Sequence, residues 1–449
     1  MKLHLAPHAL PFLLSVVLSA GSAAAVTTDA DSIDSGSGSY DGSEHVPAVP
    51  GPAAPTPAVK GDPGSSITVG GYLQSQYEHH QDSEDQLRQD GARLNLDRFL
   101  VRRARLRLAG DWEWTGASIE FDGNTTSGGF RADLYRAEAK LHYRPDPSAP
   151  ALVEGAIGAM TIPFGFELVQ SSRLRPFMER SLVVRSLFPG PVDLGARVGG
   201  TWRWLHATVA VMNGEPRGSG EFAGADPNGA KDLLVRVGVD TGSAAPLRVS
   251  GNVSFLGGRG FHAGTEATKA RVEWRDLNED GVAQPFENST IPARAATPSE
   301  TFRRWAVGVD AQLEYQTALG SSWLLGEIIL AQNLDRFLFE NDPVVTGLDA
   351  RQFGWYVAAV QELGRYALAG FRFDSYDPDS NVFDSRGGKL VPRSMAIQTF
   401  SPVVGLVLPD LARLTFQYDF TLDHLARDEQ GLPADRSNDA WTLRLQVNL

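Results

Sequence analysis

Four arginines lie between residues 102 and 107, and three of them alternate with other residues. Successive side chains of a β-strand point to opposite faces, so Arg103, Arg105 and Arg107 would share one face of a strand. Guanidinium groups bind carboxylate and phosphate oxygens through parallel N–H donors. The spacing therefore predicts a strand with an anion-binding face. Arg102 has the opposite parity, so it lies near an edge of the layer that the strand crosses or a β-bulge re-aims it.

Acidic residues follow on the next predicted strand. Ser118, Glu120 and Asp122 alternate, and the Gly110-Asp111 turn separates them from the arginines. Neighbouring antiparallel strands would place these carboxylates opposite the guanidinium groups, hold the arginines in position and tune the local potential. Two interpretations stay open: the arginines bind passing anions, or they only neutralise the carboxylates.

A separate run of oxygen-bearing residues has the spacing of a twelve-residue calcium loop. Acidic and amide side chains alternate, Gly281 occupies the turn position, and a carboxylate closes the run, which is the ligand set that calcium prefers. The candidate ligands are Asp276, Asn278, Asp280, the carbonyl of Val282, and Glu287. No helical pattern flanks them, so we expect either Ca²⁺ in an external loop or an ordinary polar loop. We find no Ser-His-acid set, and the sequence does not predict an enzyme.

The elements that must position these residues are short β-strands, which recur from Ile67 to Leu449. Apolar and polar residues alternate within them, and Gly, Pro, Asn and Asp clusters separate them. One apolar face consists of Trp305, Val307, Val309, Ala311, Leu313 and Tyr315, and the polar face behind it includes Arg304, Asp310, Gln312 and Glu314. Another apolar face runs from Tyr135 to Tyr143. Aromatic residues near both ends of such faces, with alanines between them, favour a membrane β-barrel over a soluble exported β-sandwich.

The number of strands sets the size of the barrel. About 16 or 17 segments qualify, residues 266–275 among them, and an even number is needed, so we predict an antiparallel barrel of about 16 strands. A barrel of that size encloses an aqueous channel. An arginine that faces lipid at mid-depth costs about 2–4 kcal/mol, so the arginine face should line the lumen. Leu100, Ala104, Leu106 and Leu108 would then face lipid.

The two ends of the chain predict how it is exported and how the barrel closes. Lys2, an apolar stretch from Leu10 to Leu18, and Ala23-Ala24-Ala25 predict a signal peptide over residues 1–25 that is cleaved on export. Residues 26–66 are acidic and then rich in proline, which predicts a disordered spacer before a barrel over residues 67–449. The last strand alternates from Trp441 to Leu449 and should pair with the first strand.

The overall composition excludes several classes of protein. The chain has no cysteine, which argues against a lipoprotein and against a small disulfide-rich domain. Its formal net charge of −13 makes it a poor candidate for binding nucleic acid.

The last strand looks like the C-terminal signal that the barrel assembly machinery recognises, although that signal usually ends in an aromatic residue rather than Leu449.

Residues 99–201 resemble the phosphate-selective porin family, the porins O and P, of bacterial outer membranes. The resemblance rests on the segments Phe99–Gly110, Ile119–Asp122, Pro163–Glu167, Ser171-Ser172, Phe177–Ser181 and Phe188–Gly199. It implies a homotrimer of 16-stranded barrels in the outer membrane, each with a long loop, about Ile162 to Ala196, folded into the lumen. It also implies that Arg102, Arg103 and Asp122 lie at the constriction.

The expected function is passive diffusion of small anions, such as phosphate, through an arginine-lined lumen. The inner loop would add Arg173, Arg175, Arg180 and Arg185 to that lining. One departure concerns the strand before the loop, where the family commonly has basic residues and this chain has Ala156 and Ala159. Another small anion is therefore an equally open substrate. The alternative function is a non-conducting, calcium-binding or structural outer-membrane barrel.

Overall fold

The computed structural model describes residues 58–60, 66–87, 91, 93–145, 151–217, 222–242, 246–339, 341–386, 388–392, 395–423, 425 and 434–449. All of them belong to the second of two compact units, Pro47–Leu449. The predicted signal peptide lies outside the described residues. So does the predicted spacer, apart from Ser66 and a short strand β1 (Ala58–Lys60) that pairs with the start of β2.

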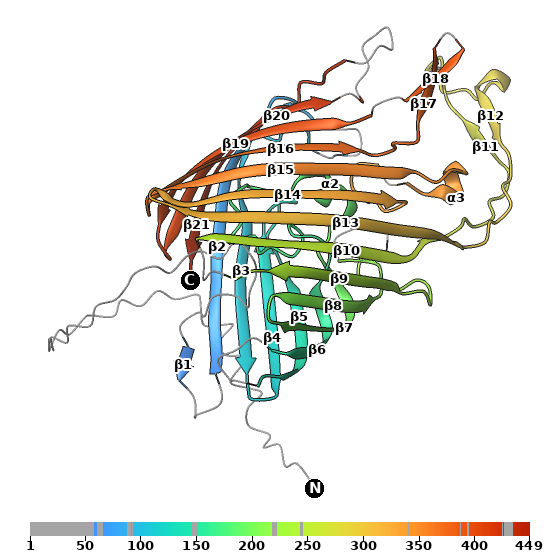
Figure 1. The fold of residues 1–449 in the computed structure, drawn as a ribbon. Helices are drawn as coiled ribbons and strands as arrows, with labels where there is room; N and C mark the ends of the chain where they lie inside the picture. The colour runs from blue at the N-terminus through green and yellow to red at the C-terminus, as the bar shows by residue number, and fades with distance from the viewer. Residues whose placement is uncertain are drawn as a thin grey trace, which may run out of the picture. The chain divides into compact units, whose positions relative to one another are not determined.

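Sixteen strands form one closed antiparallel barrel (Figure 1), which confirms the predicted fold class. Each pairs with the next along the chain, and tight turns such as residues 203–204 join several of these pairs directly. The strands are β2 (Ser66–His80), β3 (Arg98–Asp111), β4 (Thr115–Asn124), β5 (Arg131–Tyr143), β6 (Val153–Thr161), β7 (Val192–Trp202), β8 (Leu205–Met212), β9 (Asp232–Asp240), β10 (Leu247–His262), β13 (Glu300–Thr317), β14 (Gly320–Gln332), β15 (Arg351–Leu363), β16 (Ala367–Asp377), β19 (Ile397–Leu408), β20 (Ala412–Asp423) and β21 (Ala440–Asn448).

The last strand closes the ring, as the sequence predicted. β21 pairs with β2 from Tyr72 opposite Asn448 to His80 opposite Ala440. Closure leaves no unpaired edge among the barrel strands, which is the condition for crossing a bilayer with strands. Within the described segments, no helix is long and apolar enough to span a membrane.

The two ends of the barrel differ in the length of their connections. Residues 203–204, 318–319, 364–366 and 409–411 form tight turns at one end, whereas 162–191 and 263–299 form long connections at the other. In outer-membrane barrels the short turns face the periplasm. We therefore call the two ends the short-turn end and the long-loop end.

Side-chain exposure confirms the predicted alternation. On β13 the outer face includes Val309 and Tyr315, each 51% exposed, while Asp310 on the inner face is 2% exposed. The outer apolar residues therefore form a lipid-facing band, and the charged residues between them line the lumen.

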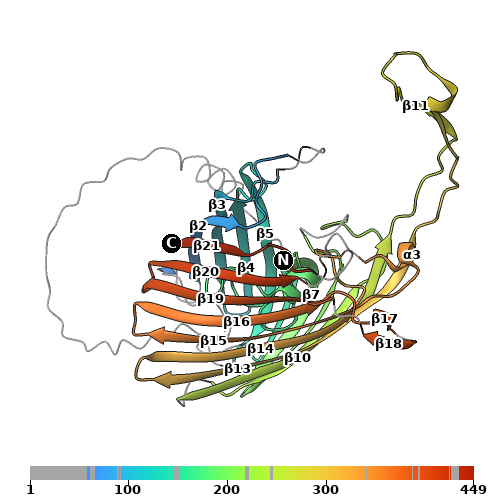
Figure 2. The same cartoon turned by 90° about the horizontal axis from the view of Figure 1, so that it is seen from above.

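The segment 266–275, predicted as a barrel strand, is not part of the barrel. Its second half forms β11 (Arg271–Trp274), which pairs only with β12 (Asn288–Ile291) in a hairpin within the long connection between β10 and β13 (Figure 2). Alternation alone could not show this, because a two-stranded hairpin has the same period as a barrel strand. The other small elements are β17 (Phe383–Arg386), β18 (Lys389–Pro392), the helices α2 (Leu182–Leu187) and α3 (Pro343–Thr346), and the 3₁₀ turn η1 (Pro285–Glu287).

Removal of residues 440–449 is expected to prevent the barrel from forming. Without β21, both β2 and β20 would expose unpaired backbone groups to lipid, and each such group costs several kcal/mol. Folded barrels in detergent migrate differently on gels before and after boiling, and the truncated chain should lose this difference. Deletion of residues 271–291, which removes only the hairpin, is the control and should retain it.

Candidate functional site in the barrel lumen

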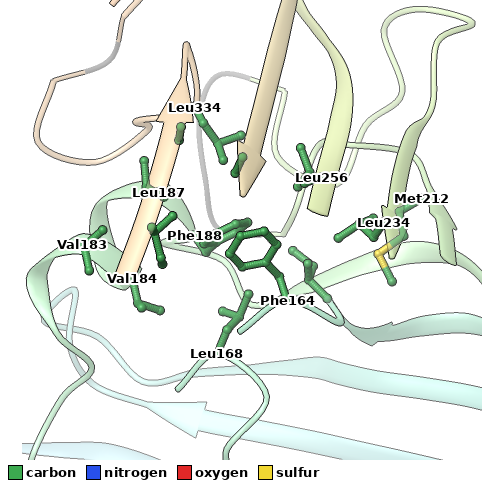
Figure 3. Close-up of a cluster of buried hydrophobic side chains, with 14 of the residues drawn as sticks. Phe164, Leu168, Val183, Val184, Leu187, Phe188, Met212, Leu234, Leu256 and Leu334 are labelled. Atoms are coloured by element: carbon green, nitrogen blue, oxygen red, sulfur yellow. The ribbon is translucent and has the colours of Figure 1, made fainter. Parts of the chain in front are cut away.

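The connection between β6 and β7, residues 162–191, folds into the lumen and is called the inner loop below. Within the loop, Phe164 packs on Phe188 with ring centroids 5.0 Å apart, and apolar contacts anchor the loop to the wall. Leu187 of α2 belongs to the same cluster as Met212 and Leu256 of the wall (Figure 3). The predicted inner loop is confirmed, but it ends before β7, so residues 192–196 belong to the wall.

Glu179 of the inner loop binds three arginines of the wall. Its carboxylate accepts hydrogen bonds from Arg102 (3.0 Å), Arg103 (2.8 Å) and Arg444 of β21 (2.9 Å). Burial by itself would raise the pKa of Glu179, but the three guanidinium charges outweigh it and hold the pKa well below 4.5. The carboxylate is therefore ionised and ties the inner loop to β3 and β21.

A β-bulge explains the parity of Arg102. Gln74 of β2 pairs with Arg103 and the next residue, Ser75, pairs with Val101, so Arg102 is the extra residue of β3. The bulge turns Arg102 into the lumen beside Arg103, as one of the two sequence interpretations required. The bulge also reverses the face to which the preceding residues of β3 point. Leu100, expected to face lipid, is 7% exposed and lies opposite Gln76 on the lumen side.

The predicted pairing of arginines with carboxylates is present between β3 and β4. The Arg105 guanidinium lies 3.4 Å from Glu120 and 3.3 Å from Asp122. Arg136 of β5 donates to the other oxygen of Glu120. Both arginines are therefore held in place by carboxylates of the wall.

A second bulge brings an aromatic ring into the same region. Glu120 pairs with Arg136 and Phe121 pairs with Leu134, which leaves Tyr135 as the extra residue of β5. Its ring lies 3.7 Å below the Arg105 guanidinium, in cation–π contact. The expectation that Tyr135 belongs to the lipid-facing aromatic belt is therefore wrong, because the bulge re-aims the side chain.

The four arginines of the inner loop have different positions. Arg180 donates to the carbonyls of Glu167 and Leu168 within the loop, and burial lowers its pKa. Arg175 is 2% exposed, and burial lowers its pKa to about 9. Arg185 lies on α2, and only Arg173 lines the cavity described next.

A cavity of about 370 Å³ lies at the short-turn end between the inner loop and strands β2 to β6. We call it the basic cavity, because its cationic lining residues outnumber the acidic ones. The cations are Arg105, Arg107, Arg136, Lys140, Arg144 and Arg173, and the acids are Asp111, Glu120 and Glu154. Arg107 forms no ion pair with any described residue, so its charge faces the cavity.

A cation lies beside Ala156 on the neighbouring strand of the lumen wall. Lys140 of β5 is its direct cross-strand partner and lies 3.1 Å from Glu138 and 3.6 Å from Glu154. Lys140 of β5 therefore supplies a positive charge next to position 156 of β6, where the family commonly has a basic residue.

Sequence reasoning missed several functional residues. The sequence pattern places Arg444 and Tyr135 only on strand faces, and it gives Glu179 no role beyond its place in the segment Phe177–Ser181. One signal was available for Glu179: it is an acidic residue between the arginines of the inner loop. Its three partners lie far away in the sequence, so only the tertiary structure identifies them.

The calcium-loop residues lie in the β11–β12 hairpin. Asp276 accepts hydrogen bonds from the amides of Asp280 (3.1 Å) and Gly281 (2.7 Å), and Gly281 has a φ of 72°. Glu287 instead accepts from Trp274 Nε1 (2.9 Å) and from the amide of Gln284 (3.0 Å). Within the described part of the chain, no three acidic or histidine side chains are close enough together to hold a metal ion. As arranged here, the loop is not a complete calcium cage.

Comparison with known structures agrees with this fold. The outer membrane channel DcaP of Acinetobacter baumannii is 10% identical with a TM-score of 0.51, and the match covers 87% of this chain and 99% of that one. The trimer form of OmpT, an outer membrane protein of Vibrio cholerae, is 8% identical with a TM-score of 0.50, over 86% and 100% of the two chains. A search of curated protein sequences found no significant match.

Comparison with protein families identifies the chain more closely. The profile of the phosphate-selective porins O and P matches residues 73–360, which is most of the barrel and includes the inner loop and the arginines of β3. The closed barrel, the inner loop and this match together show that the chain belongs to the phosphate-selective porin O and P family and is a porin of the outer membrane.

Proposed function

We propose that this porin conducts small anions and that phosphate is one of them. The observation that carries the proposal is the excess of cations over acids around the basic cavity. Guanidinium and ammonium groups that line a water-filled passage raise the local concentration of anions and lower that of cations. The description of the family as phosphate-selective supports phosphate as a substrate.

The anion would contact a different set of arginines from the one that the resemblance implies. Glu179 neutralises much of the charge of Arg102 and Arg103. Arg107 and Arg173, which form no ion pair with any described residue, keep their charge directed at the cavity. We therefore place the selective step at the basic cavity, on the short-turn side of the inner loop.

Recording from single channels in planar bilayers tests this function. In a potassium chloride gradient, the reversal potential should show a preference for chloride over potassium. Added phosphate should reduce the chloride current, because both anions compete for the same cations. A cation preference without block by phosphate would contradict the proposal. The absence of discrete conductance steps from folded protein would favour the non-conducting alternative.

We also propose the partners that go with a porin. The exposed apolar band would contact outer-membrane lipid, and the barrel assembly machinery would recognise β21. A homotrimer is supported by the trimeric form of OmpT, whose fold this chain shares. Passage would involve no chemical conversion of the solute. Chemical cross-linking of the detergent-extracted protein should give a trimer band, and a monomer alone would contradict this assembly.

A weak calcium site in the β11–β12 hairpin is a second proposal. It is supported by the turn that places the Asp276 and Asp280 side chains around Gly281. To complete the site, Glu287 would have to release Trp274 and turn towards the two aspartates. An external loop needs only millimolar affinity, about 10⁻⁴ to 10⁻³ M.

Calcium is therefore expected to change the fluorescence of Trp274, because the indole would lose its hydrogen bond to Glu287. The Asp280→Asn variant should lose this change, and Trp274→Phe identifies the signal among the other tryptophans. Asp379→Asn, in a different loop, is the matched control and should behave as the original protein. No calcium-dependent change in the original protein would leave the hairpin as an ordinary polar loop.

A further inference from the structure

Glu327 of β14 faces the first turn of the inner loop. Its side chain is almost fully buried, and one oxygen, Oε2, accepts hydrogen bonds from the amide of Glu167 (3.3 Å) and the hydroxyl of Tyr356 (3.4 Å). Gly165 has a φ of 59°, and a Cβ at this position would overlap the Glu327 carboxylate. The amide of Gly165 donates to Ser254 Oγ (3.0 Å). The glycine of the Pro-Phe-Gly segment is thus the residue that lets the loop lie against Glu327.

A second buried carboxylate lies beside Glu327. Asp310 of β13 is its direct cross-strand partner, and such partners have Cβ atoms about 4.5–5.5 Å apart. Asp310 Oδ1 accepts from Asn252 (2.8 Å) and Gln312 (2.6 Å). The remaining oxygens, Asp310 Oδ2 and Glu327 Oε1, are buried and have no donor among the described residues.

The surrounding charges do not balance two ionised carboxylates. Arg236 of β9 is the nearby cation that no hydrogen bond commits to another carboxylate. Arg372 of β16 is bound to Glu167 (3.1 Å) and Asp374 (3.3 Å). On β8, His206 is hydrogen-bonded to Asn252 rather than to either acid. Two buried carboxylates at directly paired positions cannot both ionise readily, and a single shared proton would place a donor between the two free oxygens.

We infer that Glu327 and Asp310 share one proton and that this proton holds the first turn of the inner loop, residues 163–167, against the wall. Loss of the proton would leave adjacent charges on Glu327 and Asp310, with the carboxylate of Glu167 close by. Repulsion would then detach the turn from β14 and widen the passage. Glu327 is in this sense a positioning residue, because it acts on solutes only through the loop.

The expected result is a single-channel conductance that rises as the pH is raised from about 5 to 9, a range that includes the values known for buried glutamates. The inference rests on the proposed function, because the readout is conductance. In the Glu327→Gln variant the amide is neutral at every pH and can still donate to Asp310, so the conductance should stay at its low-pH value throughout. The Asp310→Asn variant should also lose the pH dependence, which provides a second reading if one variant folds poorly.

The matched control is Glu314→Gln. Glu314 also faces the lumen from β13, but its partners are Gln316 and Arg248 and none belongs to the inner loop. This variant should keep the original pH profile. The inference would be overturned if the conductance of the original protein did not depend on pH, or if the Glu327→Gln variant kept the pH dependence of the original protein.

Hydrogen exchange separates this inference from the proposed function. If the folded protein does not conduct, the proposed function fails. The exchange rates of the Gly165 and Glu167 amides can still be compared at low and high pH. Faster exchange at high pH in the original protein, but not in Glu327→Gln, would support the shared proton. If the exchange rates of the original protein and of Glu327→Gln responded equally to pH, after correction for the intrinsic rates, the shared proton would be contradicted.

Discussion

The Glu179→Gln variant is expected to increase the preference of the channel for anions by roughly tenfold, the lower end of the range for charge-focused passages. The amide keeps the shape of the side chain but removes the negative charge that faces Arg102, Arg103 and Arg444. Those three arginines would then attract passing anions rather than the loop. The reversal potential in a salt gradient measures the change.

The control for this substitution is Glu78→Gln. Glu78 binds Arg98 (2.8 Å) on the same two strands, β2 and β3, and none of its hydrogen bonds to described residues reaches the inner loop. It should leave the reversal potential unchanged. The larger change Glu179→Ala also removes the hydrogen bonds that tie the inner loop to the three arginines. That variant should loosen the loop and give noisier currents. An unchanged reversal potential in Glu179→Gln would mean that this cluster lies off the path of the ions.

The pH dependence of this cluster follows from the lowered pKa of Glu179. A carboxyl group whose pKa is lower in the folded state stabilises that state fully above its unfolded value, which is near 4.3. The contribution is lost only as the pH falls through the folded value. The Glu179 clamp should therefore persist from neutral pH to about pH 4 and open only under stronger acid. This behaviour is opposite to that expected of the Glu327–Asp310 pair, which responds when the pH is raised.

The double variant Arg107→Gln with Lys140→Gln is expected to reduce the anion preference strongly and to move the reversal potential towards zero, because it leaves four cations against three acids around the basic cavity. It removes two of the cations of the basic cavity and leaves all of its acids. The wall should still fold, because Arg197 lies 3.3 Å from Glu138 and 2.9 Å from Glu154 and continues to pair with both acids.

The matched control removes two arginines from outside the lumen. Arg259 and Arg303 are exposed on the outer face of β10 and β13 and lie directly opposite each other. Replacing both by glutamine changes the net charge of the chain by the same amount. If this control shifted the reversal potential as much as the lumen variant, selectivity would depend on total charge and not on the basic cavity.

Much of the fold could be predicted from the sequence, for local reasons. A strand that borders both lipid and water must alternate, and this requirement is visible in segments such as 305–315 without knowledge of their partners. The same constraint placed Arg105 in the lumen and Glu120 and Asp122 opposite it, because the two strands are joined by a short turn. The inner loop came from a resemblance to the family, which the family profile bears out, whereas its end at residue 191 was decided by the start of β7.

The details that set selectivity were decided by the tertiary structure. Two bulges turn Arg102 and Tyr135 into the lumen, and a bulge arises from the register between strands, which no single strand encodes. The partners of Glu179 and Glu327 lie on strands that approach the inner loop only when the barrel closes. The sequence by itself thus determined a charged, water-filled barrel. Closure around the inner loop decided which arginines are neutralised and which face the solute, because electrostatic interactions depend on distances between residues that are remote in the chain.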